Sequence, residues 1–280
     1  MAKKLWLGFR VKHLVVHRVG LVALTKYLIK VFIAAFEDKV FRIVPSESEA
    51  LFVVGCGHSG TTLMAAKMGN HRDIFALGRK TEIFFPHKNS LFVASRMLFE
   101  WGDFARIQDK SLVLEKTPKH LYFIDSMERV APGFRVVVMI RNPLDTIASL
   151  FKRFGDIELC IERWINDNRE VLKIRDRSNV MLVRYEDMTA HPERVFVDVC
   201  HFIGREYDDD ILSSQKTVFD VAQSKGNMII RAEQVSSEIQ VKKNSWKSVF
   251  SEDEAANIWV RTSGVANELG YKDEFGFSKK

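Results

Sequence analysis

The chain has 280 residues, of which 46% are hydrophobic and 28% charged, with a formal net charge of +6. This composition is typical of a globular protein that can bury a sizeable core, and the positive charge favours anionic ligands or surfaces. No basic run of five residues and no zinc-finger spacing occurs, so nucleic acid is not an expected partner. The odd, sparse set of cysteines (Cys56, Cys160 and Cys200) favours reduced thiols in a cytoplasmic protein over a disulfide framework.

Residues 1–48 form an apolar stretch that basic residues interrupt. His17, Arg18, Lys26 and Lys30 break every possible span of about 20 apolar residues. No clear small-residue cleavage site is present, which argues against a cleaved signal peptide. The stretch predicts a basic, amphipathic N-terminal segment of one or two helices. Two interpretations stay open: the segment packs on the domain, or it lies peripherally on an anionic membrane surface.

Residues 49–280 are predicted to form the main α/β domain, which the polar run "PSESE" precedes. Strand-like and helix-like runs alternate, as in a layered fold with a central, mainly parallel sheet. The strongest strand candidate is "FRVVVMIR", a continuous apolar run expected when both faces of a sheet are covered. Strands are expected at 50–54, 111–116, 134–141 and 180–188, and helices at 61–70, 121–130, 143–154, 157–175, 191–204 and 251–270.

The segment "LFVVGCGHSGTTLM" joins the first strand to the first helix through a glycine-rich loop. Glycines let backbone N–H groups turn toward a ligand, and the start of a helix favours an anion. The spacing is that of a phosphate loop, but Thr61 replaces the lysine that reaches the β- and γ-phosphates of a nucleoside triphosphate. The loop therefore predicts a site for a shorter anionic chain, with a ligand-free turn as the alternative.

A second motif, "VVVMIRNPLDTIAS", places Arg141 at the end of the strongest strand and Ser149 eight residues later. An arginine buried at a strand end is costly unless it meets an anion, and a ligand phosphate is a natural partner. Asn142, Pro143 and Asp145 suit a helix start and are interpreted as architecture. Two anion sites on neighbouring strands fit a nucleotide with anions at both ends, such as adenosine 3′-phosphate 5′-phosphosulfate (PAPS).

In this order the motifs resemble those of the sulfotransferase superfamily, most closely its protein-tyrosine and bacterial branch. "GHSGTTLMAAKMGNH" is similar to the family's 5′-phosphosulfate loop, and "IRNPLDTIASLF" to its 3′-phosphate motif. "EKTPKHLYFID", "VRYEDMTAHPERVFVDVCHFIG" and "VKKNSWKSVFS" resemble later segments, so that the likeness spans roughly residues 50–272. The resemblance implies a P-loop, nucleotide-kinase-like three-layer α/β fold. It also implies PAPS as co-substrate, no metal, and sulfuryl transfer to a hydroxyl or amine.

The resemblance also implies which residues bind the donor. The residues expected at the 5′ anion are Gly57, His58, Ser59, Gly60, Thr61 and Thr62. Arg141 and Ser149 are expected at the 3′-phosphate, and Lys242 or Lys243 is expected to close over it. Tyr185 either contacts the nucleotide or packs in the core. Trp246 either packs the closing loop or packs in the core.

Three residues are expected to act in catalysis. Lys116 matches the lysine of the family's central motif and would stabilise charge on the transferred group. His58 stands where many members carry lysine or arginine, and a histidine is charged only when protonated. It either takes part in catalysis or shapes the loop. Glu82 is the expected general base, with a pKa raised by neighbouring phenylalanines. An ion pair with Lys80 is the alternative role for Glu82, and the rival bases are Glu115, His87 and His120.

The sequence leaves the acceptor open among glycan, lipid and peptide. Residues 83–110 and 152–178 are expected to build its pocket. The first segment is aromatic and of mixed charge, which suits stacking on a sugar or apolar contact with a lipid. Together with the basic N-terminus, it favours a carbohydrate or glycolipid. A small-molecule P-loop kinase and a non-catalytic nucleotide-binding relative are the alternative functions.

Overall fold

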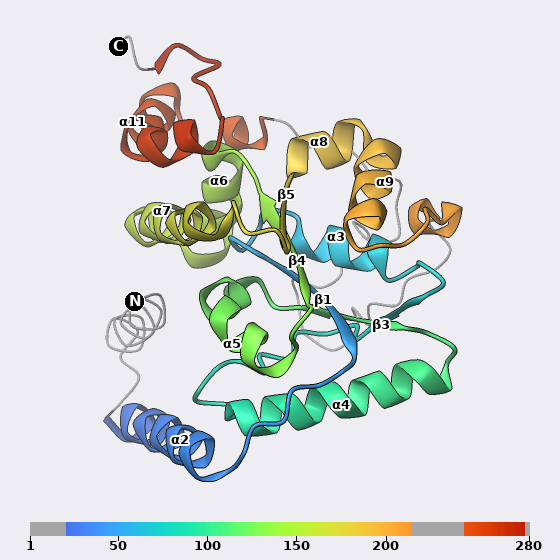
Figure 1. Ribbon diagram of the computed structural model, residues 1–280. Helices are drawn as coiled ribbons and strands as arrows, with labels where there is room; N and C mark the ends of the chain where they lie inside the picture. The colour runs from blue at the N-terminus through green and yellow to red at the C-terminus, as the bar shows by residue number, and fades with distance from the viewer. Residues whose placement is uncertain (1–20, 214–243, 278–280) are drawn as a thin grey trace.

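The structure, a computed structural model, describes residues 21–213 and 244–277. At its centre lies a five-stranded sheet in which every neighbouring pair of strands is parallel, in the order β2-β3-β1-β4-β5. The strands are β1 (Glu49–Gly55), β2 (Ile74–Ala76), β3 (Leu112–Lys116), β4 (Arg135–Ile140) and β5 (Val180–Arg184). Helices cover both faces of the sheet, as Figure 1 shows. The predicted three-layer α/β fold is confirmed.

The two faces of the sheet bury separate apolar cores. On β1, Phe52 and Val54 point into one core and Leu51 and Val53 into the other, because successive side chains of a strand alternate. The first core is covered by α4 (Leu91–Ile107), α5 (Ile124–Val130), α6 (Pro143–Phe154), α7 (Ile157–Ile174) and α11 (Glu252–Glu268). The second is covered by α3 (Thr61–Met68), α8 (Tyr185–Ala190) and α9 (Pro192–Phe202). Short 3₁₀ turns lie at η1 (Pro118–Phe123), η2 (Asp209–Leu212) and η3 (Ser245–Ser248).

The structure corrects the sequence-based assignment at three places. The strand expected over 180–188 ends at Arg184, because the chain from Tyr185 onward folds into α8. Strand β2 was not predicted, since three residues are too few to show a period. Helix α4 was not predicted either. It lies inside the segment assigned to the acceptor pocket, and the Ser90 hydroxyl caps its first turn by accepting from the Val93 amide at 3.3 Å.

Part of the N-terminal segment forms α2 (Leu21–Val40), a helix at the edge of the molecule next to α4 (Figure 1). Asp38 joins the two helices, because its Oδ1 accepts the amides of Leu91 and Phe92 at 2.6 and 3.2 Å. Strand β1 begins at Glu49, where the main domain was predicted to begin. Within the described ranges, no helix is long and apolar enough to cross a bilayer.

All three cysteines are free and buried, as expected for reduced, hydrophobic side chains. Burial raises the pKa of the Cys160 and Cys200 thiols to about 11. Both thiols are therefore protonated near neutral pH, the unreactive form.

Candidate active site

The glycine-rich loop lies at the carboxyl edge of the sheet, between β1 and α3. Gly60 has φ of 92°, and a Cβ at this position would lie 2.5 Å from Cδ2 of Tyr185, so only glycine fits without strain. No side chain caps the start of α3. Its first backbone amides are therefore available to an anion, as the phosphate-loop interpretation requires.

Two hydroxyl residues of this loop have different surroundings. The Ser59 hydroxyl is buried and has no hydrogen-bond partner among the described residues, so this loop conformation turns it away from solvent. Thr62, in the first turn of α3, accepts a hydrogen bond of 3.4 Å from Lys116 Nζ. Lys116 ends β3, and this contact places its ammonium group beside the first turn of α3.

Arg141, at the end of β4, connects the second motif with the first. Its Nη1 donates to the His58 carbonyl at 3.4 Å, and its guanidinium lies 4.2 Å above the Tyr185 ring. Its Nη2 is 3.8 Å from Asp145 Oδ2. The ring of Tyr185 thus packs between Gly60 and Arg141, which favours the packing role for this tyrosine.

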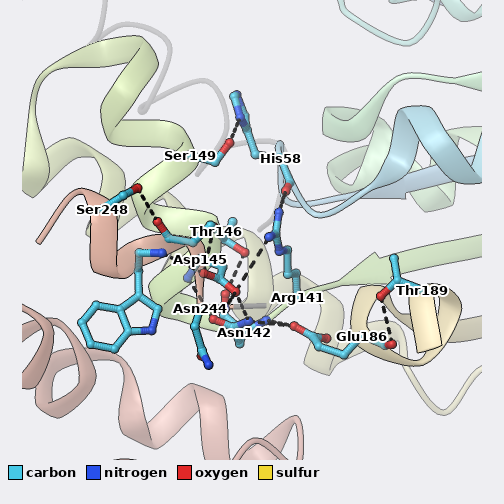
Figure 2. Close-up of polar contacts among 12 residues, drawn as sticks. His58, Arg141, Asn142, Asp145, Thr146, Ser149, Glu186, Thr189, Asn244 and Ser248 are labelled. Atoms are coloured by element: carbon cyan, nitrogen blue, oxygen red, sulfur yellow. Dashed lines mark hydrogen bonds and ion pairs between the residues drawn. The ribbon is translucent and has the colours of Figure 1, made fainter. Parts of the chain in front are cut away.

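His58 and Ser149 form a second, shorter contact between the two predicted anion motifs. Nδ1 of His58 lies 2.7 Å from the Ser149 hydroxyl, which α6 presents (Figure 2). His58 also has a left-handed backbone, with φ of 73°, which is uncommon for a residue with a side chain. The contacts with Ser149 and Arg141 hold the residue in this conformation.

Asp145 organises the segment that follows Lys242 and Lys243, two residues that lie outside the described ranges. Its carboxylate accepts the backbone amides of Asn244 and Trp246 at 3.1 and 3.0 Å and the Ser245 hydroxyl at 2.9 Å (Figure 2). The Trp246 ring packs against Phe275 and Phe277. Both Asp145 and Trp246 therefore have the architectural roles that the sequence allowed.

Glu82 lies beside the end of β3. Its backbone amide donates to Thr117 Oγ1 at 3.3 Å, and its φ is 56°. About one-third of the side chain is exposed, and the carboxylate is 3.7 Å from Lys88 Nζ. Phe84 and Phe85, expected to line this carboxylate, are instead buried in the core, where each ring contacts His120.

The three rival bases, Glu115, His87 and His120, are all buried in the core. Glu115 is fully buried and accepts hydrogen bonds from Thr81, Thr117 and His120 at 2.7, 2.6 and 2.9 Å. Burial alone would raise its pKa, but His120 and the hydroxyl donors outweigh this effect and hold the pKa below its ordinary value. His87 is buried with its ring against Tyr27 and Phe85. Glu82 is the most exposed of these candidates.

Replacing Glu115 by glutamine is expected to cost about 1–3 kcal/mol of unfolding free energy at pH 7. Because folding lowers the Glu115 pKa, its stabilisation is present above the ordinary value of 4.5 and lost as the pH falls below it. Urea unfolding at pH 7 and 3.5 should therefore show a smaller difference for the variant than for the wild type. The exposed Glu100→Gln variant serves as control; equal pH dependence in wild type and Glu115→Gln would contradict the assignment.

Sequence reasoning missed a charged cluster beneath the loop. Asp167 is fully buried and accepts from Lys119 Nζ and, at 2.7 Å, from the Tyr122 hydroxyl. Arg163 Nε lies 3.9 Å from the same carboxylate, and a Cβ on Gly57 would come within 2.8 Å of Arg163 Nη2. Two cations therefore border the loop. Arg163 and Asp167 carry no local sequence signal for this role, because α7 lies about 100 residues further along the chain.

Comparisons with known proteins were consistent with one another. Residues 90–209 match the sequence model of the Sulfotransferase family. A curated relative from Caenorhabditis briggsae, "Putative protein-tyrosine sulfotransferase", is 22% identical over 242 residues, covering 73% of this chain and 83% of the relative.

Among solved structures, the sulfotransferase domain of the Synechococcus PCC 7002 olefin synthase has a TM-score of 0.62 at 17% identity, covering 83% of this chain and 98% of that one. Mouse sulfotransferase SULT7A1, solved in complex with PAP, has a TM-score of 0.53 at 13% identity, covering 79% and 85%. The structural matches establish the shared fold.

Proposed function

We propose that this chain, which is similar to the Sulfotransferase family over residues 90–209, transfers a sulfuryl group from PAPS to a hydroxyl or amine acceptor. The observation that carries the proposal is the 2.7 Å contact between His58 Nδ1 and Ser149 Oγ. This contact joins the anion loop to the second phosphate motif, so both ends of one nucleotide can bind in a single site.

The residues present fit this donor. The uncapped start of α3, with Thr61 and Thr62, suits the 5′-phosphosulfate. The buried guanidinium of Arg141 and the Ser149 hydroxyl suit the 3′-phosphate, because arginine pairs well with phosphate oxygens. Lys242 or Lys243 would close over that phosphate. The donor supplies the sulfuryl group, and the chain supplies its orientation.

The catalytic roles follow from the positions around the loop. The acceptor oxygen forms a bond to sulfur as the bond from sulfur to the 5′-phosphate oxygen breaks. Lys116, which contacts Thr62, would stabilise the negative charge on the departing phosphate, and His58 can add to this stabilisation when it is protonated. Glu82 would accept the proton of the acceptor, since its carboxylate is partly exposed while Glu115 is locked by three donors.

We assign the acceptor to the carbohydrate or glycolipid class. This assignment is supported by the aromatic content of residues 83–110, since aromatic rings can stack on sugars or contact lipid. Helix α4 occupies most of that segment, and an adjacent hollow of about 240 Å³ is lined by Phe92, Phe99 and Arg96 together with other residues. The loop that carries Glu82, the expected base, leads directly into α4.

The test is a binding titration with adenosine 3′,5′-bisphosphate and, separately, with ATP–magnesium. We expect the protein to prefer the bisphosphate, and Arg141→Ala to weaken its binding by about 10- to 100-fold, as expected when charge-assisted hydrogen bonds are lost. Arg135→Ala, at the opposite end of β4, is the matched control and should bind normally. A preference for ATP–magnesium would instead support a kinase. Transfer of radiolabelled sulfate to glycans, glycolipids and tyrosine peptides then identifies the acceptor.

A further inference from the structure

Helix α2 has two apolar faces, of which the domain covers only one. Tyr27 and Ala34 are buried, whereas Ile29, Phe32, Phe36 and Val40 are 52, 73, 57 and 55% exposed. Positions 29, 32, 36 and 40 follow the spacing of one helix face and form a stripe. We call these four residues the α2 stripe. Further exposed apolar side chains adjoin it at Leu28, Ile33, Phe41 and Val44. A contiguous exposed apolar surface of this kind is typical of an interaction site.

The covered face of α2 is firmly attached to the domain. The Tyr27 ring packs in a tilted arrangement on His87, with 4.9 Å between ring centroids. Just beyond the helix, the half-exposed ring of Phe41 stacks on Phe92 at the same distance. Asp38 caps the start of α4. These contacts fix the orientation of the helix, so the α2 stripe faces away from the core.

The distribution of charge along the chain indicates which kind of partner binds the α2 stripe. Residues 1–48 contain nine Lys/Arg and three Asp/Glu, while residues 49–280 contain 33 of each, so the whole formal charge of +6 lies in the N-terminal segment. In the described part of that segment, Lys26, Lys30, Lys39 and Arg42 are exposed around the stripe. Of the three acidic residues, Asp38 is engaged at the start of α4, Glu37 is half-buried on α2, and Glu47 is exposed beyond the helix. An apolar stripe bordered by basic side chains is complementary to an anionic lipid surface.

We propose that α2 docks in the plane of an anionic membrane, with the α2 stripe inserted at the headgroup level, and thereby presents the active site to a lipid-borne acceptor. The second part rests on the proposed function. Contacts that link α2 to the expected base support it. His87, whose ring packs against Tyr27 of α2, precedes Lys88, and Lys88 pairs with Glu82. A second copy of the chain suits the stripe less well, because a symmetric contact would bring the basic side chains of both copies together.

Sedimentation of the full chain with vesicles tests the docking. In 0.1 M salt, we expect at least tenfold stronger binding to vesicles with 30% phosphatidylserine than to pure phosphatidylcholine. Phe32→Ser/Phe36→Ser should weaken binding at least tenfold, and Lys26→Gln/Lys30→Gln by a similar factor on anionic vesicles. The matched control is Phe104→Ser/Ile107→Ser, which removes two exposed apolar side chains from α4 and should bind like the wild type.

Unchanged binding by the α2 variants, or no wild-type binding, overturns the proposal. A dimer that Phe32→Ser/Phe36→Ser dissociates would also overturn it, in favour of a second copy.

Transfer assays test the acceptor. We expect Phe32→Ser/Phe36→Ser to reduce sulfate transfer to a glycolipid in anionic vesicles at least tenfold, and to leave transfer to the free glycan of that lipid unchanged. An equal loss on both acceptors would overturn the presentation role. The absence of transfer to either acceptor by a wild type that still binds vesicles would refute the proposed function and leave the docking intact.

Discussion

Replacing Glu82 by glutamine is expected to lower kcat for sulfate transfer by about 10²- to 10⁴-fold, the usual contribution of a general base. Glutamine keeps the size and the backbone contact with Thr117, but its side chain cannot accept the acceptor's proton. Binding of adenosine 3′,5′-bisphosphate should stay unchanged, since the donor residues are elsewhere. The measurements are steady-state kinetics with radiolabelled donor and a separate bisphosphate titration.

Lys88→Met is the matched control for Glu82→Gln. It removes the same 3.7 Å ion pair but keeps the carboxylate, so a base at position 82 predicts nearly normal kcat. If Lys88→Met loses as much activity as Glu82→Gln, the ion pair itself is what matters and Glu82 acts by positioning the loop. If Glu82→Gln is fully active, another group takes the proton.

Replacing Asp145 by alanine is expected to cost about 3–5 kcal/mol of unfolding free energy, the range observed when one partner of a buried charged network is removed. The carboxylate is 1% exposed and accepts hydrogen bonds from Asn244, Ser245 and Trp246. It also lies 3.8 Å from Arg141. Its loss would leave buried donors unpaired and release the segment that follows Lys243. Urea unfolding measures the stability, and a bisphosphate titration measures the accompanying loss of donor affinity.

Two control variants, Asp145→Asn and Asp125→Ala, test whether the loss of stability comes from the buried carboxylate of Asp145. Asparagine retains an acceptor oxygen without the charge, so Asp145→Asn should be less destabilised than the alanine variant. Asp125 is 83% exposed and pairs with Arg177 at the surface, where such pairs contribute little, so its removal should cost below about 1 kcal/mol. A comparable small cost for Asp145→Ala would refute the view that Asp145 anchors the closing segment.

Much of the fold could be predicted because its strands are buried on both faces and therefore appear as apolar runs. The run over 134–141 matches β4 closely. Strand β2 could not be predicted, because Ile74–Ala76 becomes a strand through its pairing with β3 rather than through any local pattern. The segment from Tyr185 was assigned to a strand because its apolar start continues that of β5, whereas packing against α9 and the second core favours helix α8.

In the candidate site, too, local motifs could be predicted from the sequence, whereas contacts between distant segments could not. The anion loop and the motif from Arg141 to Ser149 are local, so glycine spacing and a strand-end arginine were enough to predict them. The ion pair of Glu82 is also short-range, yet the sequence pointed to Lys80 as its partner, whereas the structure places Lys88 Nζ 3.7 Å from the carboxylate. The Arg163–Asp167 pair beneath Gly57 gave no signal at all, because only the packing of α7 under the loop brings it there.

By itself, the sequence predicted the layered α/β fold, proposed two anion motifs and determined the basic character of the N-terminal segment. These properties depend on residue type and short-range spacing. Only the tertiary structure decided that His58 contacts Ser149, 91 positions away, and that Asp145 receives the closing segment. It also decided which face of α2 is left uncovered. The physical reason is that such contacts depend on how distant elements pack, and their geometry is not encoded in any single stretch of chain.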